Sequence, residues 1–278
     1  MPPIAHILPA LPRLKIVDVG AAATPDGPAY AKLMRALPCD VIGFEPIREE
    51  CEKLNAQKMP GHLYLPHAIG DGSSRTFYEC SSVDTSSLFE PNNALADKFQ
   101  SLGEPLRVVG SREIQTRRLD DLPETAGADF LKLDVQGGEL LVLQGAEERL
   151  RDVLVVHTEV EFLPLYKGQP LFADIDSYLR ARGFAFHTMT PFGRTFKPML
   201  VNNSIYASVR QLIWADAVYV RDFMTFMDLP VEALLKLAAI LHENYGSFDL
   251  AALALEAYDK QRGSALQLAY LRRLSGQP

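Results

Sequence analysis

Short apolar runs alternate with stretches of helical periodicity over most of the chain. Between residues 15 and 219 the runs are rich in Val, Ile, Leu and Phe. Strands that alternate with amphipathic helices indicate βαβ units, and therefore an α/β fold with a mostly parallel sheet and helices on both faces. The expected strands cover residues 15–20, 40–45, 62–69, 129–134, 153–160, 184–189 and 214–220, and the expected helices cover residues 28–37, 48–57, 139–150 and 174–182.

The pattern changes between residues 73 and 119. Polar-rich alternation predicts strands at 76–78 and 113–116, with a helix near 93–99 and a Ser-rich segment at 80–88. We interpret this region as an insertion or lid. The third strand contains Pro66, which has no N–H to donate to a ladder, so we expect that strand at an edge of the sheet.

Strand signals end at Asp222. Residues 230–243, 249–260 and 265–273 predict three amphipathic helices separated by Gly246 and Gly263. We expect one domain over residues 1–221 and a helical appendage over 222–278. The appendage has the residue pattern of one tetratricopeptide-type hairpin, but a packed appendage or a homodimer contact through these helices is the simpler interpretation.

Composition narrows the classes of function. The 278 residues include 28 Lys and Arg against 35 Asp and Glu, a net charge of −7. This charge gives no general reason to bind nucleic acid or an anionic membrane, and it leaves room only for a local basic patch. The cysteines, Cys39, Cys51 and Cys80, form no CxxC pair and are odd in number, which suits a reducing cytoplasm.

No apolar run is long enough to predict a membrane span, because charges interrupt each run before the roughly 18 residues that a span needs. Residues 1–14 contain four prolines and lack the pattern of an export signal. We expect a cytoplasmic protein.

Candidate chemistry follows the first two strands, because ligands of open α/β sheets bind at the carboxyl ends of strands. The first strand ends in Asp18, Gly20 and Ala21, but the next glycine is Gly27, so a full GxGxxG is absent. This weakens a dinucleotide-binding interpretation. Glu45 ends the second strand, 25 residues after Gly20, a spacing suited to a carboxylate that accepts from a ribose diol. It is equally suited to cap the next helix.

Four motifs stand at the ends of four expected strands. They read IVDVGA from residue 16, GFEP from residue 43, AIGD from residue 68 and LKLDVQGGE from residue 131. Together, in this order and spacing, they resemble the FkbM family of S-adenosylmethionine-dependent methyltransferases. The resemblance covers residues 15–161 and leaves the helical tail outside.

The resemblance implies a class I methyltransferase fold, a Rossmann-like seven-stranded sheet whose last strand is antiparallel. It implies S-adenosylmethionine as cofactor and O-methyl transfer to a hydroxyl of a small molecule, sugar or glycan. The cofactor contacts that it implies fall on Asp18, Gly20, Ala21, Glu45, Pro46, Ala68, Ile69, Gly70 and Asp134. The net charge of −7 leads us to expect no nucleic acid partner.

This chain departs from the family pattern at two positions. Ala22 replaces an asparagine in the usual DVGAN, and Gln136 replaces the glutamate of the usual DVEGxE. Neither change removes the expected ribose and methionine contacts.

The catalytic hypothesis rests on strand alternation. Period-two alternation places Lys132 and Asp134 on one face of their strand and His157, Glu159 and Glu161 on one face of the next. We expect Asp134 or His157 to act as general base, with Glu159 orienting the histidine or the acceptor. The alternative is a structural ion pair between Lys132 and Glu159. No ligand spacing predicts a metal site.

Two other functions stay open at this point. A nicotinamide oxidoreductase shares the doubly wound sheet, although the absent glycines count against it. A catalytically degenerate, cofactor-binding protein that acts through its helical tail is the non-enzymatic alternative. Phe162, Tyr166 and Phe192 follow late strands and are candidates for an apolar wall around the acceptor.

Overall fold

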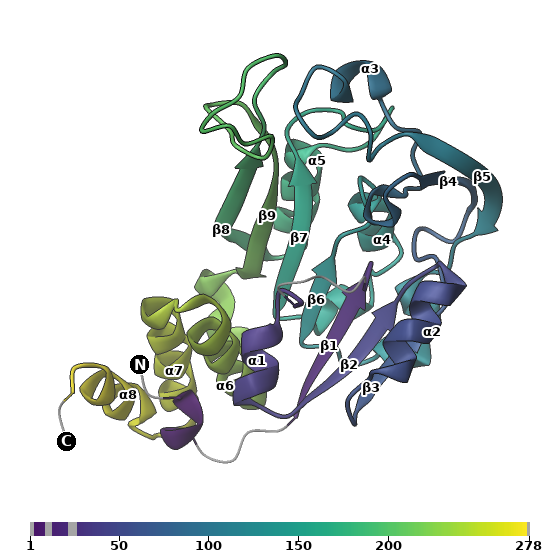
Figure 1. Ribbon diagram of the computed structural model, residues 1–278. Helices are drawn as coiled ribbons and strands as arrows, with labels where there is room; N and C mark the ends of the chain where they lie inside the picture. The colour runs from purple at the N-terminus through teal and green to yellow at the C-terminus, as the bar shows by residue number, and fades with distance from the viewer. Residues whose placement is uncertain (1–2, 9–12, 22–26, 277–278) are drawn as a thin grey trace.

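A seven-stranded sheet forms the centre of the molecule (Figure 1), which we describe from a computed structural model covering residues 3–8, 13–21 and 27–276. Its strand order is β3-β2-β1-β6-β7-β9-β8, and β9 is antiparallel to both of its neighbours. This confirms the sheet that the sequence and the resemblance predict. The strands are β1 (Leu14–Val19), β2 (Cys39–Phe44), β3 (His62–Leu65), β6 (Phe130–Leu133), β7 (Val155–Glu161), β8 (Phe184–Gly193) and β9 (Leu212–Arg221).

The predicted insertion is a separate two-stranded antiparallel sheet. It consists of β4 (Ser74–Cys80) and β5 (Val108–Gln115), with the short helix α3 (Asn93–Ala96) between them. The insertion lies beyond the upper right edge of the main sheet in Figure 1. The strands predicted at 76–78 and 113–116 overlap β4 and β5, and the interpretation of this region as an insertion or lid stays a prediction.

Helices cover both faces of the main sheet. They are α1 (Ala31–Ala36), α2 (Arg48–Ala56), α4 (Glu139–Gln144), α5 (Phe172–Arg180), α6 (Val231–Ile240), α7 (Phe248–Arg262) and α8 (Leu266–Leu274). Short 3₁₀ turns span Ile4–His6, Val83–Thr85, Leu119–Asp121, Pro123–Thr125, Arg149–Arg151 and Phe223–Asp228, and a π-helical turn spans Leu241–Tyr245.

Strand alternation divides the apolar side chains between two cores. On β6, Phe130 packs with α1, α6 and α7, whereas Leu131 and Leu133 pack with α4 and α5. The C-terminal helices therefore complete one covering layer of the sheet, and they share a continuous core with Leu14 and Val155. The expected boundary at residue 221 coincides with the end of β9. The division into two domains stays a prediction.

Several elements are shorter than expected, among them α1, α3, β3 and α4. β3 ends at Leu65 because Pro66 follows it, and β3 lies at the sheet edge as predicted. α4 ends at Gln144, and the next residue, Gly145, packs so closely on the backbone of Gly70 that an added Cβ would lie 2.0 Å from the Gly70 carbonyl oxygen.

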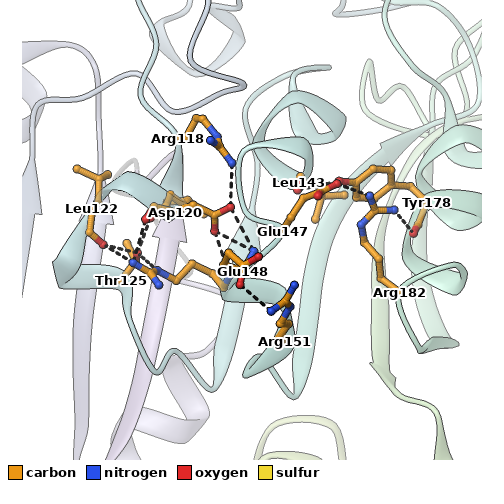
Figure 2. Close-up of polar contacts among 12 residues, drawn as sticks. Arg118, Asp120, Leu122, Thr125, Leu143, Glu147, Glu148, Arg151, Tyr178 and Arg182 are labelled. Atoms are coloured by element: carbon orange, nitrogen blue, oxygen red, sulfur yellow. Dashed lines mark hydrogen bonds and ion pairs between the residues drawn. The ribbon is translucent and has the colours of Figure 1, made fainter.

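Charged side chains next to α4 and α5 are used in structural contacts (Figure 2). The Asp120 carboxylate accepts hydrogen bonds from the backbone N–H groups of Glu148 and Arg149, and it pairs with Arg118. Arg182 donates to Glu147, which joins α5 to the end of α4. These contacts hold the chain that returns from the insertion against the helices.

No helix among the described residues is both long and apolar enough to cross a membrane.

Candidate active site

A cavity of about 210 Å³ opens at the carboxyl ends of β1, β2 and β6. The strand order reverses at β1, so this is the switch point at which ligands bind in open α/β sheets. Most of the predicted cofactor residues line it: Gly20, Glu45, Pro46, Ala68, Ile69 and Asp134. The Ser-rich segment also contributes, because Val83, Asp84, Ser86, Ser87 and Leu88 form part of its wall.

The backbone segments that follow β1 and β6 lie very close together at one side of this cavity. A Cβ added to Gly20 would lie 1.8 Å from the backbone oxygen of Asp134, and Gly20 has a φ of +80°. Only glycine fits such an approach at a positive φ. Lys132 stabilises this close approach, because its Nζ donates a hydrogen bond to the Gly20 carbonyl oxygen at 2.7 Å. This glycine therefore shapes the cavity wall through β6, beyond any direct contact with a ligand.

Glu45 places a carboxylate in the cavity wall. Its side chain is buried, with 6% exposed, and Oε1 accepts a hydrogen bond from the Ile47 N–H at 2.8 Å. Burial raises the pKa of Glu45, and the Ile47 amide partly opposes that rise. The described residues offer Oε2 no hydrogen bond, so one oxygen serves the start of α2 and the other is available to a ligand. Both sequence interpretations of Glu45 fit this arrangement.

Three of the predicted cofactor residues lie outside the cavity wall. The buried Asp18 carboxylate accepts from the Tyr30 hydroxyl at 2.7 Å and pairs with Lys132 at 3.1 Å. The Ala21 N–H donates to the Phe44 carbonyl, and Gly70 packs against Thr116 and Gly145. Asp18 thus contacts Lys132, which lines the cavity, and its predicted contact with the cofactor stays a prediction. The family departure at Ala22 lies outside the described residues.

Asp134 is the candidate base that reaches the cavity. Its side chain is 41% exposed, and it contacts Lys132 at 3.6 Å. Its Oδ1 accepts from Gln136 Nε2 at 3.0 Å, and the same Nε2 donates to Glu159 Oε2 at 2.8 Å. Glu159 is outside the cavity wall and is joined to Asp134 through the amide of Gln136.

His157 faces the C-terminal helices. Its Nδ1 is 3.1 Å from the Tyr245 hydroxyl in the π-helical turn, and it is outside the cavity wall. Burial, with help from the nearby Lys132 ammonium, lowers the pKa of His157 to about 4, so the ring is neutral at pH 7. This geometry favours Asp134 over His157 as the group that meets an acceptor.

The ion pair of Lys132 with Glu159, which was the structural alternative, is not found among the described residues. Lys132 lies beside Asp18 in the register of β1 with β6, and its ion pairs are with Asp18 and Asp134. These carboxylates raise the pKa of Lys132 and keep it charged. The predicted strand alternation is correct, because Lys132 is in register with His157 on β7. The ion-pair partner of Lys132, however, is Asp18 on β1, the neighbouring strand on the other side.

Gln136 and Tyr166 link the site to its surroundings, a role that the sequence did not reveal. Gln136 has a φ of +57°, and its Oε1 accepts from the Tyr166 hydroxyl at 2.8 Å. Its backbone oxygen accepts from Ser87 Oγ at 2.6 Å. The available signal was the glutamine in the DVQGGE motif. Tyr166, expected in an apolar wall, contributes its hydroxyl.

Several buried acids surround this network. Glu139 and Glu161 are almost completely buried, and burial raises the pKa of Glu139 to about 7 and that of Glu161 well above its usual range. The pKa of Asp216, opposite Glu159 on β9, is raised to about 6 by the same cause. Across the described residues, no three His, Cys, Asp or Glu side chains form a group that could hold a metal ion.

Comparison with known proteins gives one family match. Residues 18–186 match the family model described as the methyltransferase FkbM domain. No protein of curated function matches the chain.

Several solved structures are similar in part. A methyltransferase FkbM from Methylobacillus flagellatus KT is 13% identical, with 76% of this chain and 45% of that chain covered and a TM-score of 0.41. Magnesium protoporphyrin IX methyltransferase from Synechocystis PCC 6803 with bound SAM is 12% identical, with 76% of this chain and 71% of that chain covered and a TM-score of 0.36.

Proposed function

Because the chain belongs to the FkbM methyltransferase family, we propose that it transfers a methyl group from S-adenosylmethionine to a hydroxyl oxygen of a small molecule, sugar or glycan. The observation that carries this proposal is the cavity at the point where the strand order reverses. Its wall contains the buried carboxylate of Glu45 and the close approach of the Gly20 and Asp134 backbones. Because the chain belongs to a methyltransferase family, we set the nicotinamide oxidoreductase alternative aside.

The residues of the cavity fit this cofactor. Glu45 offers a carboxylate oxygen to the two ribose hydroxyls, and charge-assisted hydrogen bonds of this kind are strong. Ala68 and Ile69 provide an apolar wall for the adenine, while Gly20 and Asp134 border the methionine part. When bound, the cofactor supplies an electrophilic methyl group on a sulfonium sulfur.

Asp134 is the general base in this proposal. Its carboxylate is at the cavity, where it would accept the proton of the acceptor hydroxyl as the methyl group passes from the sulfonium sulfur to the oxygen and S-adenosylhomocysteine is left. Lys132 and Gln136 hold the carboxylate from two sides, at 3.6 and 3.0 Å. Glu159 acts through Gln136 and is a positioning residue. Fixed geometry of this kind is the main protein contribution to an in-line displacement.

The acceptor class is supported by charge. A net charge of −7 disfavours a phosphate-rich acceptor, whereas the hydroxyls of a sugar carry no charge to repel. The three cysteines are buried and unpaired, which supports a reducing compartment.

Turnover measurements on a panel of hydroxylated acceptors test the base assignment. Asp134→Asn keeps the size of the side chain and removes the proton acceptor, so we expect a loss of at least about 100-fold in kcat. His157→Gln serves as the comparison. His157 lies against the π-helical turn between α6 and α7 rather than in the cavity, so this variant should retain most activity. Full turnover in Asp134→Asn would refute the assignment. No turnover by the wild type on any acceptor, with the cofactor bound, would favour the degenerate alternative.

A further inference from the structure

The loop between β8 and β9 carries an unusual number of exposed apolar side chains. Figure 1 shows this loop at the upper left, beyond the ends of both strands. The exposed fractions run from 40% to 67% for Phe196, Met199, Leu200, Ile205, Tyr206, Val209 and Leu212. A concentration of exposed apolar side chains on one loop is a candidate interaction site.

The loop has a defined shape. Phe196 packs on Phe99 with ring centroids 4.4 Å apart, and the Lys197 N–H donates to the Lys98 carbonyl at 2.8 Å. A tight turn at Asn202 and Asn203, both with positive φ, reverses the chain at its tip. The loop is therefore held against the segment around α3 while most of its apolar side chains face outward.

The loop also differs in charge from the rest of the chain. No Asp or Glu occurs between residues 177 and 215, although the whole chain has a net charge of −7. Lys197 and Arg210 are exposed, and Arg194 is half-buried over the Trp214 ring at 4.8 Å. On the neighbouring segment, the charges of Asp97 and Lys98 offset each other. The loop is thus a local basic and apolar surface.

We propose that residues 194–212 dock on an anionic lipid surface. Apolar side chains enter the boundary between headgroups and acyl chains, while lysine and arginine pair with anionic headgroups. Charge argues against a second copy of this chain as the occupant, because two such loops meeting across a two-fold axis would bring like charges together.

The position of the loop gives this docking a direction. β8 runs parallel to β7, so the loop that follows it lies at the same edge of the sheet as the cavity. A membrane bound there faces the edge at which Asp134 is exposed. Docking would bring acceptors in the lipid headgroup layer within reach of the cavity. This consequence rests on the proposed function, whereas the docking itself does not.

Co-sedimentation with vesicles tests the proposal. We expect the full chain to bind vesicles made of equal parts phosphatidylcholine and phosphatidylglycerol, to bind pure phosphatidylcholine more weakly, and to release at high salt. The variant Met199→Ser, Leu200→Ser, Tyr206→Ser should lose about tenfold or more in binding. Lys197→Gln with Arg210→Gln should lose the preference for anionic vesicles.

A matched control uses exposed methionines at the opposite edge of the sheet. Met224→Ser with Met227→Ser, in the turn after β9, should bind vesicles as the wild type does. Absence of wild-type binding, or equal binding by the loop variant, would overturn the proposal, as would a wild-type dimer that the loop variant converts to monomer in light scattering. Circular dichroism of the same variants shows that they are folded, and their binding of S-adenosylhomocysteine tests the proposed function separately.

Discussion

The side-chain amide of Gln136 donates a hydrogen bond to the carboxylate of Glu159 at 2.8 Å. The same nitrogen donates to Asp134, and the amide oxygen accepts from the Tyr166 hydroxyl. A glutamate at this position would put a third carboxylate between two others. In this chain, the glutamine amide bridges Asp134 and Glu159, while burial and the nearby Asp134 carboxylate raise the pKa of Glu159 well above its usual range.

Gln136→Glu should lower stability and activity together. Losing a donor between two carboxylates, and adding a charge there, should cost about 1–3 kcal/mol in the free energy of unfolding. The loss should be larger at pH 8 than at pH 5.5, because burial raises the pKa of Glu159 and its ionised fraction grows as pH rises. Thermal unfolding at both pH values measures it. Gln57→Glu, on the exposed end of α2, is the control. Equal stability of the two variants would contradict the role of the amide.

Glu161→Gln should stabilise the protein at alkaline pH. Glu161 is 1% exposed, and its Oε2 has no hydrogen-bond partner among the described residues. Its pKa is raised by burial and by Glu139, so the folded state prefers the protonated form. The stability that this form provides is present below the unfolded pKa and is lost as pH rises through the folded one.

Denaturant unfolding from pH 5 to 8.5 measures this effect. The wild type should lose more stability than Glu161→Gln over this range, with a difference on the order of 1 kcal/mol or more. Glu104→Gln, at an exposed position, should follow the wild type. Parallel curves for wild type and Glu161→Gln would show that Glu161 titrates normally.

Gly20→Ala should disturb both the fold and the cavity. The new Cβ would collide with the Asp134 carbonyl, so β1 and β6 must shift apart at the site. We expect a loss of about 2–4 kcal/mol in unfolding free energy and weaker binding of S-adenosylhomocysteine. Gly168→Ala separates the two causes, because Gly168 also has a positive φ, of +72°, but has no atom within 4 Å of the added Cβ. If both variants lose the same amount of unfolding free energy, the close approach of Gly20 to Asp134 is not what requires glycine at position 20.

Binding of S-adenosylhomocysteine should weaken in acid through Glu45. The ionised carboxylate is the better acceptor for ribose hydroxyls, and burial raises its pKa. Affinity should therefore be full above that raised pKa and should fall as pH drops through it. Calorimetry between pH 5 and 8 measures this. Glu45→Gln should bind about tenfold more weakly at pH 8 and show a flatter pH profile. An unchanged profile in this variant would remove Glu45 from the ribose role.

Local patterns predicted much of the fold. Period-two alternation correctly placed Lys132, His157 and Glu159 on one sheet face, and Pro66 correctly marked an edge strand. These features depend on neighbouring residues, so the sequence records them directly. The cavity wall at Gly20 and Glu45 was predictable for a similar reason, since strand ends in a parallel sheet meet at one edge.

Long-range partners were beyond such patterns. Lys132 pairs with Asp18 because of the register between β1 and β6, strands separated by more than a hundred residues. The contact of His157 with Tyr245 depends on how the C-terminal helices cover the sheet. Each side chain had several partners of suitable chemistry in the sequence, and only tertiary packing selects among them.

Calorimetry of the wild-type chain with S-adenosylhomocysteine, and separately with NAD, tests the central claim most directly. We expect S-adenosylhomocysteine to bind at one site with a dissociation constant of about 1–100 μM, a range that a few charge-assisted hydrogen bonds and one buried ring can supply. NAD should show no comparable heat, because the second glycine of GxGxxG, which admits a pyrophosphate, is absent. Binding of NAD alone, or of neither ligand, would contradict the account.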